Sequence, residues 1–300
     1  MRKLTSCKKY FNFDLSFKLV VGACALISIF TTFAIIYILG SESLLFFKEV
    51  SVSNFLFGTR WEPLLSPQHF GVLPLIAGTF LIVLGSAVIA IPCGLITAIY
   101  LSEYAGKKTR NFIKPILEIL AGIPTVVYGY FALTMITPVL KNIFPDIEVF
   151  NALSGAIVVG IMIFPMISSL CDDALNSLPR SLKEGAYAMG ATSFEVIFSI
   201  LIPSALNRII SSFILAISRA IGETMAVVLA AGATPKLTLN FLESIQTMTS
   251  YIVQVSLGDT PADGIEYKTC FAVGALLFII TLVMNIIGRK VSKRFHKGIN

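Results

Sequence analysis

Residues 184–203 read EGAYAMGATSFEVIFSILIP and form a polar interruption in a very apolar chain. Residues 181–184 (SLKE) and 192–195 (TSFE) both have the spacing of a capping box, in which a hydroxyl and a carboxylate satisfy the free N–H groups at a helix start. Gly190 stands between the boxes, where a helix can end on a residue with a positive φ angle. The stretch therefore predicts a short helix, a glycine turn and a second helix that enters the membrane near Pro203. Such a stiff corner can transmit force to a docked partner.

The rest of the chain has the composition of a membrane protein. Of its 300 residues, 56% are hydrophobic and 13% are charged, whereas globular domains contain about 25% charged residues. A helix of about 20 apolar residues crosses the hydrocarbon core of a bilayer. Uncharged runs of that length cover residues 19–41, 70–102, 119–140, 149–171 and 269–288, and a sixth apolar stretch, 209–234, contains two charges. We therefore predict an all-α membrane protein with six helices.

The positive charges are distributed unevenly between the predicted loops. With both termini placed in the cytoplasm, 17 of the 23 Lys and Arg residues lie on the cytoplasmic side and 5 lie outside. Positive residues are enriched in cytoplasmic loops of membrane proteins. The net charge of +6 therefore indicates topology and contact with membrane lipid, not nucleic-acid binding. The asymmetry predicts a multi-pass membrane protein with both termini cytoplasmic, and the family resemblance described below implies the bacterial inner membrane.

The prediction divides the chain into four parts. Residues 1–18 form a basic cytoplasmic tail, 19–71 the first transmembrane helix and an external segment, and 289–300 a second basic tail. The remaining part, 72–288, holds five helices and the corner at 181–203. The first apolar run is too long for the apolar region of a signal peptide, so we expect it to be retained.

The sequence lacks the usual catalytic and metal-binding motifs. It contains no GxxxxGK[ST] phosphate loop, no HExxH and no GxSxG, and its five cysteines form no CxxC pair. We therefore expect no metal site, no cofactor held by this chain and no enzymatic reaction. If the protein works with ATP and magnesium, another chain would bind them.

Residues 184–203 resemble the cytoplasmic motif E-A-A-x3-G-x9-I-x-L-P of permease subunits in ATP-binding-cassette (ABC) importers. The matching positions are Glu184, Ala186, Gly190, Ile200 and Pro203. The departures are Gly185, where the pattern has Ala, and Ile202, where it has Leu. The resemblance implies the MetI-like six-helix bundle of type I importers, with two ATP-binding subunits docked on this loop.

Three other strings resemble the C-type permease subunit of bacterial phosphate-specific (Pst) importers. They are FLFGTRWEP at 55–63, AGIPTVVYG at 121–129 and RAIGET at 219–224. Together with the corner, this resemblance covers about residues 55–230. It implies phosphate as substrate, an A-type permease as partner and an extracytoplasmic phosphate-binding protein that delivers the substrate.

Arg219 and Glu223 are the charges predicted to lie deep in the fifth helix. Each costs about 2.5–3.5 kcal/mol to insert, and at i, i+4 they share a helix face and can pair. One interpretation is a neutralised structural pair. The other is a cation in an aqueous path that meets an oxyanion, because the guanidinium geometry suits phosphate. The resemblance to Pst permeases implies the second role.

Several alternatives follow from the same residues. An importer of sulfate or molybdate would use such an arginine equally well. A proton-coupled secondary transporter would use Glu223 as proton carrier, but the corner would then have no purpose. A membrane enzyme is disfavoured because the sequence shows no group of residues that could serve as nucleophile, base or metal site. Local expectations are aromatic interfacial anchors around Trp61, a solvated helix end at Asp172 and Asp173, and a short external helix within 240–255.

Overall fold

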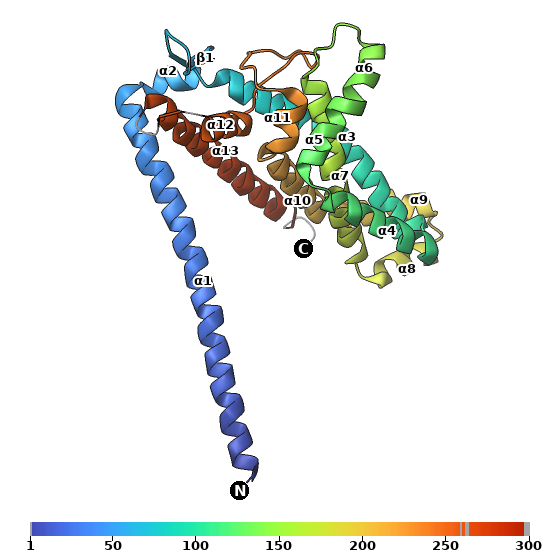
Figure 1. Ribbon diagram of the computed structural model, residues 1–300. Helices are drawn as coiled ribbons and strands as arrows, with labels where there is room; N and C mark the ends of the chain where they lie inside the picture. The colour runs from blue at the N-terminus through green and yellow to red at the C-terminus, as the bar shows by residue number, and fades with distance from the viewer. Residues whose placement is uncertain (1, 259, 262–263, 297–300) are drawn as a thin grey trace.

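The computed structural model describes the backbone of residues 2–258, 260–261 and 264–296 and the side chains from residue 17 to residue 291 of that range. Almost all of it is helical (Figure 1). The first half contains α1 (Arg2–Glu49), α2 (Val52–Phe57), α3 (Leu73–Ile99), α4 (Lys107–Gly122), α5 (Thr125–Phe131) and α6 (Thr137–Ile143). The second half contains α7 (Ala152–Asn176), α8 (Arg180–Ala188), α9 (Ser193–Glu195), α10 (Ile202–Ile221), α11 (Met225–Ala231), α12 (Met248–Leu257) and α13 (Ile265–His296).

Short π-helical segments continue three of these helices without a break. They are η1 (Tyr100–Tyr104), η2 (Ala132–Ile136) and η3 (Val196–Leu201). Strands β1 (Trp61–Glu62) and β2 (His69–Phe70) pair antiparallel, with Trp61 opposite Phe70. Among the described residues, this two-stranded hairpin is the only sheet.

Six helical segments are long and apolar enough to span a membrane. They are Phe17–Glu49, Leu73–Tyr104, Thr125–Ile143, Ala152–Asn176, Ser193–Ile221 and Ile265–Val291. The predicted all-α, six-helix membrane fold is confirmed. The prediction missed α4, an amphipathic helix that precedes the third span, because its four basic residues look like those of a loop.

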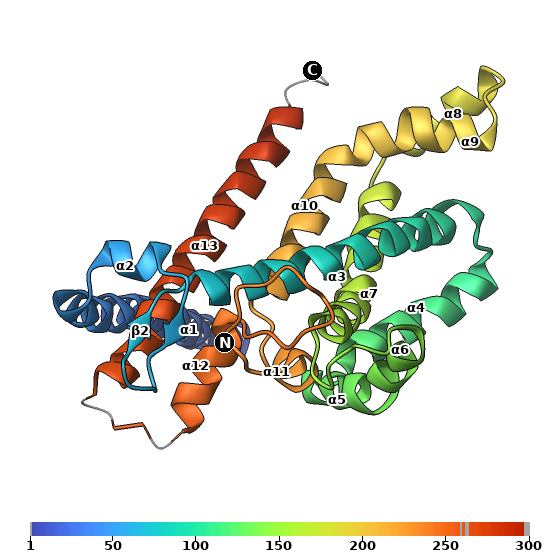
Figure 2. The same cartoon turned by 90° about the horizontal axis from the view of Figure 1, so that it is seen from above.

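The core of the bundle is the contact between α3 and α7, and α10 packs against both. Small residues let the backbones approach closely. A Cβ atom added at Gly94 would lie 2.6 Å from Ile167, and one at Gly85 would lie 2.7 Å from Ala156. Close packing through small residues is the usual way in which membrane helices associate. Figure 2 shows α3 crossing the molecule, with α10 on one side and α4, α5 and α6 on the other.

A second apolar cluster joins α1, α2 and the hairpin to α12 and α13. Phe55 is fully buried and Trp61 is 1% exposed; the Trp61 ring meets Phe55 edge to face, and Tyr251 at a ring-centroid distance of 4.8 Å. The expectation of interfacial anchors is therefore wrong for these two residues. They form a small core because the segment between α1 and α3 folds back onto α12.

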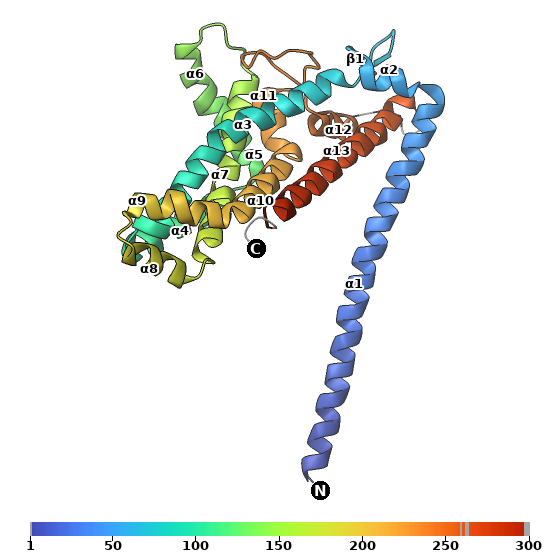
Figure 3. The same ribbon diagram turned by 180° about the vertical axis from the view of Figure 1, so that it is seen from behind.

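Helix α1 extends far from the bundle (Figures 1 and 3). Only the C-terminal part of α1 packs against α13 among the described residues. We expected a tail at residues 1–18 and a first helix in the apolar run at 19–41, but one helix runs from Arg2 to Glu49. The basic side chains of residues 2–9 and 293–297 lie outside the described residues. Helices α8 and α9 lie at the end of the bundle opposite to α2 and the hairpin.

Candidate functional site

The corner predicted at 181–203 consists of α8, a turn at residues 189–192 and the continuous helix formed by α9, η3 and α10. Gly190 has a φ angle of +84°. Its N–H donates to the Tyr187 carbonyl, and the Ala191 N–H donates to the Ala186 carbonyl. These two bonds make a Schellman motif, which satisfies the last carbonyls of α8. The predicted glycine turn is confirmed.

Only one of the two predicted capping boxes is present. The Thr192 hydroxyl accepts from the Glu195 N–H, and the Glu195 carboxylate accepts from the Thr192 N–H, which completes the second box. The first box is wrong, because α8 begins at Arg180 after Pro179 and has no side-chain cap. The proline before the helix sets its start, and Ser181 lies inside the first turn.

The six residues predicted to couple to an ATPase occupy both arms of the corner. Glu184 and Gly185 are exposed on α8, whereas Ala186 is 8% exposed and packs into the core. Gly190 forms the turn, Ile200 lies half-buried in η3, and Pro203 lies in the first turn of α10. Apolar side chains are also exposed here, among them Leu182, Tyr187, Met189, Phe194 and Phe198.

The corner is tied to the bundle by an ion pair. Lys183 of α8 pairs with Glu103 of η1, whose carboxylate is mostly buried. The Ser102 hydroxyl also donates to Glu103. Movement of α8 is thereby linked to the end of α3, although neither Lys183 nor Glu103 stands out in the sequence.

Asp172 forms a second ion cluster near the same end of the bundle. Its side chain is fully buried, and it lies 2.8 Å from both Arg110 and Lys114 of α4. Asn176 donates a further hydrogen bond of 2.7 Å to it. The expected solvated helix end is therefore wrong for Asp172, because α7 continues to residue 176 and α4 covers it. The neighbouring Asp173 is exposed, as expected.

Arg219 and Glu223 lie at a break between two helices. Helix α10 ends at Ile221 and α11 begins at Met225, so these two charges do not share one continuous helix. Among the ion pairs of the described residues, none joins Arg219 to Glu223. The expected i, i+4 pair is absent because the chain turns out of the helix at Gly222, between the two charges.

A cavity of 680 Å³ lies at this break. Its walls are Ala121, Met162, Met166, Ser218, Arg219, Gly222 and Glu223. Arg219 is exposed, whereas Glu223 is 8% exposed and accepts a 3.3 Å hydrogen bond from the Ala226 N–H of α11. The guanidinium thus faces open space, while the carboxylate is partly engaged by the backbone. A planar cation in this setting can bind an oxyanion.

The remaining walls of the cavity come from α4 and α7, and the sequence analysis did not find them. Ala121, Met162 and Met166 are apolar residues inside apolar runs, so no chemical signal marks them. No cluster of metal ligands is present among the described residues. The cavity therefore presents Arg219 and Glu223 as its charged groups.

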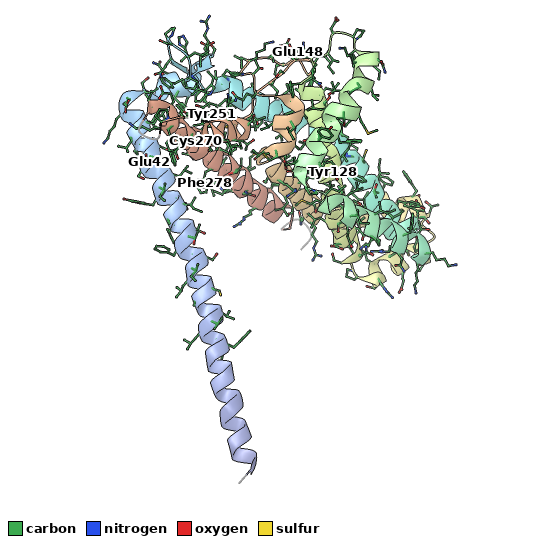
Figure 4. All side chains as sticks on the ribbon, viewed as in Figure 1. Glu42, Tyr128, Glu148, Tyr251, Cys270 and Phe278 are labelled. Carbon is green, nitrogen blue, oxygen red and sulfur yellow. The ribbon has the colours of Figure 1, made fainter. Side chains whose placement is uncertain are left out.

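A charged cluster holds the loop that precedes α12 at the other end of the bundle (Figure 4 labels Glu148). Lys236 lies 3.5 Å from Glu148 and 3.4 Å from Glu243. The hydrogen bond to Glu243 and the nearby Glu148 charge raise the pKa of Lys236. The second Glu148 oxygen accepts from the Ser244 N–H at 2.8 Å, which fixes the loop on the segment that precedes α7.

Comparison with known proteins agrees with this architecture. The family described as the binding-protein-dependent transport system inner membrane component matches residues 90–297. The chain belongs to this family. It is a permease subunit of the type I ABC importers and a multi-pass inner-membrane protein.

Two curated relatives illustrate the similarity. The chain is 36% identical over 279 residues to the probable ABC transporter permease protein YqgH of Bacillus subtilis, covering 92% of this permease and 90% of the relative. It is 31% identical over 310 residues to the phosphate transport system permease protein PstC of Haemophilus influenzae, covering 95% and 96%.

Solved structures share the fold at lower identity. A bacterial alginate ABC transporter in complex with a periplasmic protein aligns with a TM-score of 0.65 and 18% identity, over 94% of this permease and 96% of that chain. The inward-facing methionine transporter MetNI aligns with a TM-score of 0.57 and 18% identity, over 75% and 94%. This likeness shows the fold only.

Proposed function

We propose that this permease is the C-type membrane subunit of an ATP-driven importer of inorganic phosphate. Several relatives that are about 30% identical carry the name phosphate transport system permease protein PstC. The strings at 55–63, 121–129 and 219–224 support the same substrate. The subunit provides part of the path and couples it to an ATPase, and its own residues make or break no covalent bond.

The observation that carries this proposal is the state of Arg219. Its side chain is exposed at an open cavity between α4, α7 and the end of α10, and no described carboxylate forms an ion pair with it. An uncompensated cation at membrane depth is costly, so its presence favours a role in transport. Phosphate offers the oxygen pairs that a guanidinium binds in a bidentate manner. Glu223, on the same cavity, limits the strength of this binding and so favours release.

The corner formed by α8 and α9 supports coupling to a partner ATPase. It presents Glu184, Gly185 and exposed apolar side chains on a stiff turn. Exposed apolar residues grouped in this way are typical of a protein-binding surface. Two ATP-binding subunits would hold the ATP and magnesium, and this chain would hold no cofactor. An A-type permease and an extracytoplasmic phosphate-binding protein complete the proposed assembly.

The proposed cycle is alternating access. ATP binding closes the nucleotide-binding pair and moves α8, and the Lys183–Glu103 ion pair transmits this movement to α3. The bundle then opens outward and receives phosphate at Arg219. Hydrolysis resets the assembly, and phosphate leaves toward the cytoplasm. The positive-inside asymmetry supports placing α8 and both termini on the cytoplasmic side.

One other class of substrate and one other mechanism fit part of these observations. Sulfate and molybdate are oxyanions that Arg219 could also bind. A proton-coupled transporter would use Glu223 alone and would leave the α8–α9 corner without a partner. Both alternatives make distinct predictions for one uptake experiment.

The test is uptake of radiolabelled phosphate by proteoliposomes that contain the two permeases and the ATPase, with the binding protein outside. We expect uptake that needs ATP inside and is unaffected by excess sulfate or molybdate. Competition by either anion would contradict phosphate specificity. Uptake driven by a proton gradient without ATP would contradict the coupling role.

A further inference from the structure

The backbone at the helix break includes the carbonyl group of Glu223, which lies outside both α10 and α11 and so takes no part in the hydrogen bonds within either helix. Glu223 lies in the unwound segment between α10 and α11, and its side chain lines the Arg219 cavity. Irregular backbone at membrane depth is tolerated only where other groups satisfy it. The partner of the Glu223 carbonyl is therefore part of how the cavity is built.

That partner is a hydroxyl from a distant part of the chain. The Thr249 Oγ1 donates to the Glu223 carbonyl oxygen at 2.8 Å. Thr249 is 6% exposed and lies in the first turn of α12, 26 residues further along the chain. We propose that Thr249 is a positioning residue, which holds the backbone of Glu223 and thereby places its carboxylate in the cavity.

The first turn of α12 is itself firmly held. The Met248 N–H donates to the Thr79 hydroxyl of α3 at 3.1 Å, and the Thr247 side chain caps α12 by accepting from the Ser250 N–H. A Cβ atom at Gly78 would lie 2.4 Å from the Gln246 carbonyl oxygen, so the chain that leads into α12 presses directly on α3.

The same turn also contacts the far end of α11. The Ser250 hydroxyl donates to the carbonyl of Gly232, the residue that ends this helix. The turn therefore bonds to the chain before α11 and to the chain after it. Thr249 and Ser250 clamp this short helix at both ends, and a movement of α12 would shift Glu223 relative to Arg219.

This inference rests on the proposed function, because the position of the Glu223 carboxylate matters for transport only if the anion binds at Arg219. A first measurement is independent of transport. It is amide hydrogen exchange of the 222–228 segment in the assembled complex. Thr249→Val keeps the shape and removes the hydroxyl, Thr249→Ser keeps the hydroxyl, and Thr281→Val removes a hydroxyl that bonds only within α13.

We expect Thr249→Val to accelerate exchange of this segment about tenfold, because a buried carbonyl loses its donor. Thr249→Ser and Thr281→Val should behave as the wild type. Unchanged exchange in Thr249→Val, or equal acceleration in Thr249→Ser, would overturn the proposal.

A second measurement tests whether Thr249 acts through Glu223. Phosphate uptake per assembled complex is compared for Thr249→Val, Glu223→Gln and the double variant. We expect Thr249→Val to slow uptake several-fold alone and to add little in the Glu223→Gln background, because the carboxylate that it positions is gone. Additive effects, or normal uptake by Thr249→Val, would overturn the positioning role. An absence of effect from Arg219 substitution would instead overturn the proposed function, and the exchange result would still decide on the hydrogen bond.

Discussion

At the residue scale, the environment of each charge decides its role more than its spacing in the sequence does. Arg219 and Glu223 have pairing distance along a helix, yet the break at Gly222 separates them. Asp172 and Asp173 are neighbours, yet one is fully buried between two cations and the other is exposed. These differences give two local predictions.

The first concerns Gly190, the glycine at the turn of the corner. Gly190→Val places a β-branched residue at a φ angle of +84°, which costs about 1–3 kcal/mol. The turn should open, and less ATPase should co-purify with the inserted permease. Gly22→Ala is the matched control, because Gly22 has open space around it and lies within α1, away from the corner. Normal recruitment by Gly190→Val would contradict the role of the turn.

The second concerns the buried carboxylate. Asp172→Asn leaves Arg110 and Lys114 without their counter-charge, and both cations are about one-third exposed, so water compensates part of the loss. We expect a loss of about 2 kcal/mol in the free energy of unfolding. Chemical denaturation in detergent measures this loss, with Asp173→Asn as the neutral control. Equal stability of the two variants would show that the cluster contributes nothing.

At the element scale, the second arm of the corner continues into α10, whereas α8 contacts the core through Ala186 and the end of α3 through an ion pair. Helix α8 is tied to the end of α3 by Lys183 and Glu103, whose side chains are 36% and 8% exposed. The connection is therefore an ion pair at the edge of the protein, and its energy is modest. Its geometric effect is larger, since it joins the surface that would meet the ATPase to the helix that packs on α7.

Reversal of this pair tests the connection. Glu103→Lys and Lys183→Glu should each lower transport several-fold while insertion is retained, and the double reversal should recover part of it. A coupling energy of about 0.5–1 kcal/mol is expected for a pair with this exposure. Uptake and ATPase rates of the assembled complex are measured for all four proteins. Strictly additive losses would show that the two side chains act separately.

The sequence predicted the elements that have strong local signals. Five uncharged apolar runs, the positive φ angle of Gly190 and the Thr192 capping box are properties of a residue and its near neighbours, and the structure has all of them. The sixth run, 209–234, is displaced, because the fifth span covers Ser193–Ile221 and its helix ends before Gly222. The break at Gly222, the burial of Trp61 and the ion pairs of Asp172 depend on packing between distant segments. Helix α4 was missed because its basic residues resemble a loop, although Leu117 is buried and Arg110 and Lys114 pair with Asp172 of α7.

At the scale of the whole molecule, the helices place the corner at one end and the β-hairpin with the Glu148 loop at the other (Figures 1 and 4). The Arg219 cavity lies between these ends. A ligand that enters from the hairpin side and leaves near α8 would therefore pass Arg219. This order is what an importer needs, provided that α8 faces the cytoplasm.

Cysteine labelling tests that orientation. Thr59 and Asn111 are both exposed and lie at opposite ends of the protein. In a cysteine-free background, Thr59→Cys should react with an impermeant maleimide in intact spheroplasts. Asn111→Cys should react only after lysis. The positive-inside rule is the physical basis. The opposite labelling pattern would place α8 outside and exclude contact with a cytoplasmic ATPase.

The central claim is that Arg219 binds the transported anion, and its most direct test is phosphate uptake per assembled complex for Arg219 variants. Arg219→Gln should lose at least about tenfold in uptake, because a charge-assisted hydrogen bond disappears. Arg219→Lys should also be impaired, since it keeps the charge but lacks the planar fork. Glu223→Gln should alter the rate and retain uptake, and the double neutral variant should assemble and fail to transport. Near-normal uptake by the double neutral variant would contradict the claim and show that phosphate is recognised elsewhere.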